Sequence, residues 1–386
     1  MSDVLLLAHN YVSPSLHEIT WNNGGSVEDT GGICKRGVAL KGKKDVKALI
    51  TAVAFMAEDF YTLAGGTVRT FIPVARIKDG TFLMPRCPMV QPQPENIGYV
   101  LKENIEEAVK KHPDALVGTY INSNVAIAAL EEVDFVYNGT VAAKLLSAIA
   151  SEHPRKQCIL AGDTAVTYSV KKAVQNKWPD FQVYGVPETC FCPTHKLIDP
   201  GDVMFAYEDA VQEVGEKDVL LDVHAEVDPR LIDFTIDHNG VVAGSGGMIE
   251  AALSATQKII IVVTEEGAVS RIKSGAKGKK IVSFGANCPN MKLNSRDEHF
   301  WVFNDLKSLK SEPKIAAKFI VEKSEYPYYR FESVGEGKTV ELGKDDILIG
   351  PCEIIVEEEI RKKAETHLQA LLDPIKFAKE LSEKLK

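Results

Sequence analysis

The stretch Val219-Leu-Leu-Asp-Val-His-Ala-Glu226 has two counterparts in the same chain, Val4-Leu-Leu-Leu-Ala-His-Asn-Tyr11 and Ala115-Leu-Val-Gly-Thr-Tyr-Ile-Asn122. In each, an apolar run typical of a buried strand ends in polar side chains. The three stretches begin 111 and 104 residues apart. The chain therefore carries an internal repeat with a period near 100 residues, which is too long for a solenoid.

Helices and further strands are predicted after each of these stretches. The predicted helices are Lys44–Glu58, Thr140–Ser151 and Gly247–Ala255, and the predicted following strands are Thr67–Pro73, Gln157–Ala161 and Lys258–Val263. Strands that alternate with helices indicate parallel sheets. The sequence thus predicts an α/β fold of three similar parallel-sheet domains with a C-terminal extension.

The repeat also predicts the domain boundaries. Repeats one, two and three are predicted at 1–92, 93–182 and 183–292, and an insertion and helical tail that pack on the core are predicted at 293–386. Within this last part, 305–350 has strand and turn signals. Segment Glu353–Lys386 is helical by propensity, and Pro374 is expected to split it into two helices.

Composition and charge exclude several classes of protein. The 386 residues include 45 basic and 54 acidic side chains, and the net charge of −9 argues against nucleic acid as the partner. Apolar runs such as Ile259–Val263 are too short to cross a bilayer, and the first residues do not resemble a signal peptide. We therefore expect a cytoplasmic protein without a membrane partner, and the sequence leaves monomer and homodimer open. In that compartment the seven cysteines need an explanation other than structural disulfides.

Three of the seven cysteines precede proline, at Cys87, Cys192 and Cys288. Fewer than one such pair is expected by chance from 7 cysteines and 18 prolines in 386 residues, and the spacings of 105 and 96 follow the repeat. If the repeats pack about a pseudo-threefold axis, the three thiolates meet near it. Three thiolates suggest a soft metal, either an iron–sulfur cluster or, less favoured, a catalytic zinc ion.

The number of these cysteines bears on the chemistry. A [4Fe–4S] cluster is usually held by four cysteines, so three would leave one iron open to act as a Lewis acid. Cys190 could be a fourth ligand through Cys190-Phe-Cys192, but that spacing is a weak signal. The remaining cysteines, Cys34, Cys158 and Cys352, are interpreted as structural.

The polar residues at the strand ends are the candidates for binding and catalysis. Ligands of parallel α/β sheets bind at the carboxyl ends of the strands. Side chains of this kind can bind a small anionic substrate and move protons near a Lewis acid. The candidates are His9, Tyr11, Tyr120, Asn122, His224 and Glu226, with His195 three residues after Cys192. Gly244-Ser-Gly-Gly247 could form an anion-binding helix start, a weak signal by itself.

At these residues the chain resembles the quinolinate synthase family over about residues 4–295. The matching pieces are Leu7-Ala-His-Asn-Tyr11, Phe55-Met-Ala-Glu58, Tyr120-Ile-Asn-Ser123, Cys192-Pro-Thr-His195, His224-Ala-Glu226, Gly246-Gly-Met-Ile249, Thr264-Glu265 and Cys288-Pro-Asn-Met-Lys292. The tail Glu353–Leu372 also resembles the last helix of the family. The resemblance implies three α/β domains around a pseudo-threefold axis and a [4Fe–4S] cluster with one open iron.

The resemblance further implies a reaction and roles for residues. The family condenses iminoaspartate with dihydroxyacetone phosphate, losing phosphate and water, in NAD biosynthesis. The implied cluster ligands are Cys87, Cys192 and Cys288; the implied substrate-binding residues are His9, Tyr120, Asn122, Thr140 and Ser245; and the implied catalytic residues, which would move protons, are Tyr11, His195, His224 and Glu226.

The chain departs from the family where substrate-binding hydroxyls are usual. Ile33, Gly139 and Gly244 stand at positions that match serine or threonine in the family, although Thr140 could replace one of these hydroxyls. The insertion near 305–350 is also unusual. Two alternatives therefore stay open: a diverged paralogue that uses the same open-iron site on another small carboxylated substrate, and a non-enzymatic iron–sulfur sensor.

Overall fold

The computed structural model describes residues 3–73, 75–78, 81–90, 99–152, 157–295, 315–323, 328–335, 338–343 and 346–384. The chain divides into two compact units. The first unit comprises Met1–Gln91, Asn124–Leu130 and Pro289–Leu368, and the second comprises Pro92–Ser123, Glu131–Cys288 and Gln369–Lys386. Among the described helices, none is both long and apolar enough to span a membrane.

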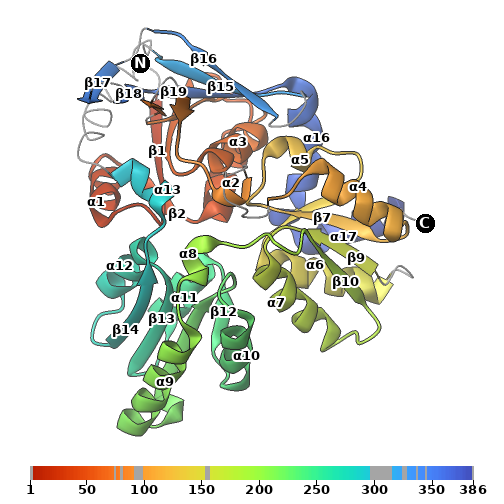
Figure 1. Cartoon of the computed structure of the whole chain (residues 1–386), viewed down its shortest axis with the longest axis vertical. Helices are drawn as coiled ribbons and strands as arrows, with labels where there is room; N and C mark the ends of the chain where they lie inside the picture. Colours follow the sequence, from red (N-terminus) through yellow and green to blue (C-terminus); the bar gives the residue numbers. More distant parts are fainter. Residues whose placement is uncertain are drawn as a thin grey trace. The chain divides into compact units, whose positions relative to one another are not determined.

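The second unit contains two four-stranded parallel sheets (Figure 1). The strands of one are β7 (Leu116–Tyr120), β8 (Phe135–Tyr137), β9 (Gln157–Ala161) and β10 (Gln182–Val186), in the order β8-β7-β9-β10. The strands of the other are β11 (Val219–His224), β12 (Val241–Ala243), β13 (Ile259–Glu265) and β14 (Lys280–Ala286), in the order β12-β11-β13-β14. Strands β7, β11 and β13 are buried along their whole length, as expected for parallel strands covered on both faces.

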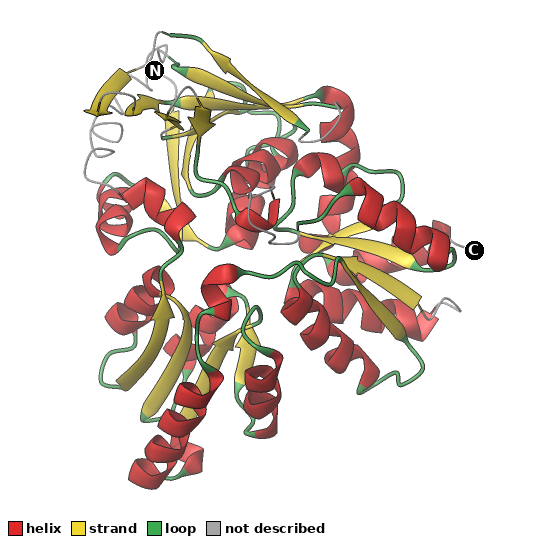
Figure 2. Cartoon of the chain, viewed as in Figure 1, coloured by secondary structure: helices red, strands yellow, loops and turns green. Residues whose placement is uncertain are grey.

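Helices flank these two sheets (Figure 2). They are α4 (Lys102–Lys111), α6 (Gly139–Glu152), α7 (Thr164–Gln175), α8 (Pro193–Lys196), α9 (Pro200–Val214), α10 (Pro229–Asp237), α11 (Ser245–Ser254), α12 (Glu266–Gly275) and α17 (Pro374–Lys384). Side chains of β11 and β13 form one apolar core with those of α9 and α10, including Leu221, Val223 and Ile261. The last helix, α17, packs on α6, and it begins at Pro374 as predicted.

The first unit contains the third copy of the same sheet. Its strands β1 (Asp3–His9), β2 (Ser26–Glu28), β3 (Val46–Thr51) and β4 (Arg69–Ile72) lie in the order β2-β1-β3-β4 and are parallel. All three sheets therefore have the same strand order: if the four strands of a repeat are numbered along the chain, they lie side by side in the order 2-1-3-4. Its helices are α1 (Pro14–Asn22), α2 (Thr30–Ala39), α3 (Ala54–Leu63), α5 (Val125–Ala128), α13 (Pro289–Lys292) and α16 (Glu358–Leu368). The predicted α/β class and its triplication are confirmed.

The C-terminal extension adds strands to the first unit. Strand β19 (Cys352–Val356) pairs antiparallel with β4, and β15 (Ala317–Val321) and β16 (Tyr329–Ser333) continue that sheet outward. A separate antiparallel sheet joins two distant hairpins, in the order β17-β18-β5-β6. Its strands are β5 (Ala75–Lys78), β6 (Thr81–Leu83), β17 (Lys338–Gly343) and β18 (Asp346–Gly350).

Two predicted helices need correction. Lys44–Glu58 is not one helix, because Val46–Thr51 forms β3, which pairs with β1, and only Ala54 onward is helical. The strand of the first repeat that is equivalent to β9 and β13 is therefore β3. The predicted strand Thr67–Pro73 corresponds to β4, which is the fourth strand of the repeat. Glu353–Val356 likewise belongs to β19, because its alternating buried residues fit a sheet. The predicted boundary at 92/93 and part of 305–350 lie outside the described residues, and the domain boundaries stay a prediction.

Candidate active site

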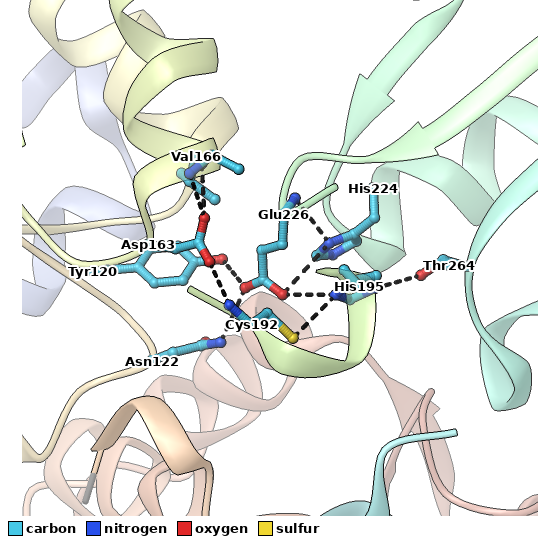
Figure 3. Close-up of polar contacts among 10 residues, drawn as sticks. Tyr120, Asn122, Asp163, Val166, Cys192, His195, His224, Glu226 and Thr264 are labelled. Atoms are coloured by element: carbon cyan, nitrogen blue, oxygen red, sulfur yellow. Dashed lines mark hydrogen bonds and ion pairs between the residues drawn. The ribbon is translucent and has the colours of Figure 1, made fainter. Parts of the chain in front are cut away.

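In the second unit, polar side chains gather where β7 and β11 end. Tyr120 is the last residue of β7 and His224 is the last residue of β11, while Asn122 and Glu226 follow two residues later. Parallel strands direct the loops after their carboxyl ends to the same edge of a sheet. The structure brings these residues from two different repeats into direct contact (Figure 3).

The carboxylate of Glu226 is the centre of this cluster. Its Oε1 atom accepts hydrogen bonds from the Tyr120 hydroxyl at 2.8 Å and from the Asn122 amide at 3.3 Å. Its Oε2 atom lies 2.9 Å from Nδ1 of His195. The side chain of Glu226 is 3% exposed. A buried carboxylate is stable only when such partners replace water, so this set of contacts keeps a negative charge inside the protein.

His195 connects Glu226 to a cysteine and to a neighbouring strand. Because an ionised carboxylate only accepts, the hydrogen bond to Glu226 places a proton on Nδ1 of His195. The same nitrogen lies 3.3 Å from Sγ of Cys192, and Nε2 lies 3.2 Å from the hydroxyl of Thr264 in β13. Both ring nitrogens are thus engaged, which fixes the plane of the ring.

A second histidine stacks on this ring. The rings of His195 and His224 are 4.1 Å apart and inclined by 9°. Nδ1 of His224 accepts the backbone N–H of Glu226 at 3.3 Å. In the first unit, Nδ1 of His9 accepts the backbone N–H of Tyr11 at 3.2 Å. Two repeats therefore hold a strand-end histidine in the same way, with Nε2 on the far side of the ring from that bond.

The surroundings shift the pKa values of two buried carboxyl groups, Glu226 and Asp163, in opposite directions. Burial alone would raise the pKa of Glu226, but the hydrogen bond from His195 and the nearby His224 and Tyr120 outweigh burial and lower it. Burial and the charge of Glu226 raise the pKa of Asp163. Glu226 therefore holds the negative charge of the pair, as expected for buried carboxyl groups whose surroundings push their pKa values apart.

Asp163 and Glu265 are positioning residues that the sequence prediction did not include in the site. Each lies at the carboxyl end of the third strand of its repeat, Asp163 two residues after β9 and Glu265 as the last residue of β13, and each caps the next helix. Asp163 accepts from Ala165 and Val166, and Glu265 accepts from Gly267. With its second oxygen, Asp163 accepts the backbone N–H of Cys192 at 2.8 Å, and Glu265 accepts that of Cys288 at 3.3 Å. An acid at the carboxyl end of a third strand was the signal that could have identified both.

The three Cys-Pro pairs share one local structure. Each proline begins a short helical turn, at Pro88–Val90, in α8 at Pro193 and in α13 at Pro289. Cys87, Cys192 and Cys288 are only partly buried, and none of them is in a disulfide. The other four cysteines are free and fully buried, and burial raises the pKa of each thiol. Those four, Cys34, Cys158, Cys190 and Cys352, favour the neutral thiol, a poor metal ligand.

Three side chains of the second unit lie close enough together to hold a metal ion. Sγ of Cys192, a ring nitrogen of His195 and a carboxylate oxygen of Glu226 lie within 4.8 Å of one another. Sulfur, nitrogen and oxygen donors in this combination suit iron or zinc.

The other predicted site residues lie on other elements of the two units. His9, Tyr11 and Cys87 belong to the first unit, where Nζ of Lys292 donates to the backbone oxygen of Tyr11 at 2.9 Å. Thr140 is exposed in the first turn of α6, and Ser245 is buried at the start of α11. Whether these residues act on a substrate stays a prediction.

Comparison with known proteins defines the class. The sequence profile of the quinolinate synthetase A protein family matches residues 1–324. The chain is 27% identical to the quinolinate synthase of Methanothermobacter thermautotrophicus over 302 residues, which cover 77% of this chain and 84% of that protein. It is 27% identical to that of Geotalea uraniireducens over 304 residues (76% and 82%) and 25% identical to that of Clostridium kluyveri over 316 residues (80% and 87%).

The chain is an enzyme of the α/β class built from three copies of one parallel sheet. It belongs to the quinolinate synthetase A protein family.

Proposed function

We propose that this enzyme condenses iminoaspartate with dihydroxyacetone phosphate, losing phosphate and water, to form quinolinate for NAD biosynthesis. The observation that carries the proposal is the contact of Glu226 with Tyr120, Asn122 and His195, directly beside Cys192. This arrangement combines an ionised carboxylate, an oriented proton carrier and hydrogen-bond donors beside the thiol of Cys192, which we assign as a cluster ligand. The names of the related proteins support the same reaction.

We assign the cofactor as a [4Fe–4S] cluster with one thiolate each from Cys87, Cys192 and Cys288. The residues fit such a group, because these three thiols are partly buried at the starts of equivalent helical turns, whereas the other four cysteines are fully buried. When bound, a cluster with three protein ligands would supply an open iron that polarises a substrate oxygen.

The protein side chains then supply binding and proton transfer. We assign His9, Tyr120, Asn122, Thr140 and Ser245 to the binding of a small anionic substrate. Glu226, which its lowered pKa keeps ionised at neutral pH, holds the proton on Nδ1 of His195 and stabilises the ring when Nε2 takes up a proton from the substrate. His224, which stacks on His195, and Tyr11 complete the set of groups that move protons.

A second candidate substrate is favoured by the starts of two helices. In α2 the carboxylate of Asp29 caps Gly32, and Ile33 is fully buried in the core. In α6 the side chain of Asn138 accepts the N–H of Val141. At both starts a side chain of the chain itself therefore occupies donors that could bind a substrate carboxylate. These differences support a paralogue that acts on another small carboxylated molecule.

Metal analysis and one assay test the proposal. Protein purified without oxygen should be brown and contain about four irons per chain. The loaded protein should form quinolinate from iminoaspartate and dihydroxyacetone phosphate, measured by mass spectrometry. Protein that contains only zinc would favour a mononuclear site at Cys192, His195 and Glu226. A full cluster without quinolinate formation would favour the second candidate substrate.

A further inference from the structure

The segment that leads to Cys87 pairs with strands of the C-terminal extension. It leaves β4, which pairs with β19 through Phe71–Glu353 and Ile72–Cys352, and then forms the β5–β6 hairpin, which pairs with β18. Strand β6 ends at Leu83, four residues before Cys87. Strands more than 260 residues later in the chain thus hold the backbone on the approach to the cysteine.

The residue before Cys87 lies in an aromatic cage, which we define as Phe319 of β15 with Tyr329 and Phe331 of β16. The guanidinium carbon of Arg86 is 4.8 Å from the ring centre of Tyr329 and 5.9 Å from that of Phe331. Phe319 packs on both rings, at 4.9 and 5.2 Å between ring centres. A cation within about 6 Å of an aromatic face is attracted by the ring quadrupole, more strongly when water is excluded.

Residues of the aromatic cage and Cys87 also line the same small cavity. Arg86, Cys87, Phe319 and Tyr329 line one cavity together with Phe55 and Glu58. Its volume is about 10 Å³, barely room for a single water molecule. Glu58 is buried, accepts the backbone N–H of Val125 and feels the positive charge of Arg86. Burial raises the pKa of Glu58 to about 7, so the close packing around this cavity, rather than a full ion pair, restricts the turn that carries Cys87.

The intervening residue of β16 provides an internal contrast. Successive side chains of a strand alternate between faces, so Arg330 points away from Tyr329 and Phe331. It forms exposed ion pairs with Glu322 and Glu332. Two aromatic residues on one face, separated by an exposed arginine on the other, show that the hairpin presents a specific surface to Arg86.

We propose that the aromatic cage of the C-terminal extension holds Arg86 and so positions the Cys87 thiolate for the cluster. Arg86 and the cage residues are positioning residues, because their effect passes through the backbone of Cys87. This inference rests on the proposed function only where it concerns the cluster, which is tested by measuring iron loss. The ordering of the Cys87 turn by the cage is a property of the protein alone and can be measured without metal.

The test compares Tyr329→Leu with Tyr329→Phe, which keeps the ring, and with Arg330→Met, which removes an arginine from the opposite face. In cluster-free protein, hydrogen exchange of residues 84–90 should be roughly tenfold faster in Tyr329→Leu, as for the loss of a buried cation–π contact. In loaded protein, iron loss to a ferrous chelator should accelerate by a similar factor. Tyr329→Phe and Arg330→Met should match the wild type in both measurements.

A second pair of variants tests the cation itself. Arg86→Met should release iron faster and alter the electron paramagnetic resonance spectrum of the reduced cluster, and Arg86→Lys should partly restore both, because it keeps the positive charge. Wild-type rates of exchange and iron loss in Tyr329→Leu and Arg86→Met would overturn the inference. A wild-type protein that binds no cluster would instead overturn the proposed cofactor, while the exchange experiment would still decide the role of the aromatic cage.

Discussion

At the scale of single residues, the proposed chemistry depends most on Glu226. Its carboxylate accepts bonds from a phenol, an amide and an imidazole, all within a buried cluster. The partners therefore lower its pKa in spite of burial. A carboxylate that stays ionised and fixes the tautomer of an imidazole stabilises the positive charge that the ring gains when its other nitrogen takes a proton.

Replacing Glu226 with glutamine tests this role. The amide keeps the shape but removes the charge that orients the proton on His195, so we expect kcat to fall at least about 100-fold, within the usual range for general acid–base groups. Iron content and unfolding temperature should stay near wild type. Glu213→Gln, which changes an exposed ion pair with Lys280, is the matched control. Activity within twofold of wild type would exclude Glu226 from proton transfer.

A second residue, Asp222, predicts a pH effect on stability. It is fully buried in β11, and neither carboxyl oxygen has a hydrogen-bond partner among the described residues. Burial raises its pKa to about 8. Because the folded protein then binds a proton that the unfolded chain releases near pH 4, this residue increasingly destabilises the fold as pH rises from about 4 to 8, by at most about 1.4 kcal/mol per pH unit.

Asp222→Val should therefore stabilise the protein more at pH 8 than at pH 5. The measurement is the free energy of unfolding in urea for both proteins across this range. The exposed Asp237→Asn variant should show no such trend. An equal effect of Asp222→Val at both pH values would mean that the carboxyl group is not neutral in the folded protein.

At the scale of elements, the residue that caps a neighbouring helix also binds the backbone of Cys192 and of Cys288 in the second unit. Asp163 caps α7 and Glu265 caps α12, and each also accepts the N–H of a candidate metal ligand. In the first unit, the start of α3 has no side-chain cap, and the N–H of Ala54 donates to the backbone oxygen of Pro85. The start of the helix after the third strand therefore holds the cysteine loop in all three repeats.

Asp163→Asn separates these two functions. One oxygen can still cap α7, while the new amide group cannot accept the N–H of Cys192. We expect a loss of about 1–3 kcal/mol in stability and faster loss of iron to a chelator. Asp199→Asn alters the cap of α9, where a single oxygen accepts both bonds, and should leave iron retention unchanged. If Asp163→Asn and Asp199→Asn retain iron equally well, Asp163 only caps α7 and does not help to hold Cys192 for the metal.

The sequence predicted the features that repeat and missed those that depend on distant partners. The strand ends at His9, Tyr120 and His224 were visible because buried parallel strands give continuous apolar runs. Strand β3 was misassigned because Val46–Thr51 is short and lies beside a helix-forming segment, so local periodicity could not distinguish the two. The pairing of β5 with β18 depends on a register across about 270 residues, which no local pattern encodes.

At the scale of the whole molecule, the proposed ligands come from both compact units. Cys87 lies in the first, whereas Cys192 and Cys288 lie in the second. A ligand that binds only the folded state stabilises whatever it binds. A cluster that requires all three thiolates therefore makes the stability of each unit depend on the other, and a metal held by Cys192, His195 and Glu226 does not.

Cys87→Ala distinguishes these two arrangements. If the cluster needs Cys87, the variant should retain far less than the about four irons of the loaded wild type, and calorimetry should show two separate unfolding transitions where the loaded wild type shows one. The buried Cys34→Ala variant controls for the loss of a thiol from the same unit and should keep its iron. Full metal content and unchanged unfolding in Cys87→Ala would place the metal on the second unit alone, because the only ligand removed would then have contributed nothing to binding.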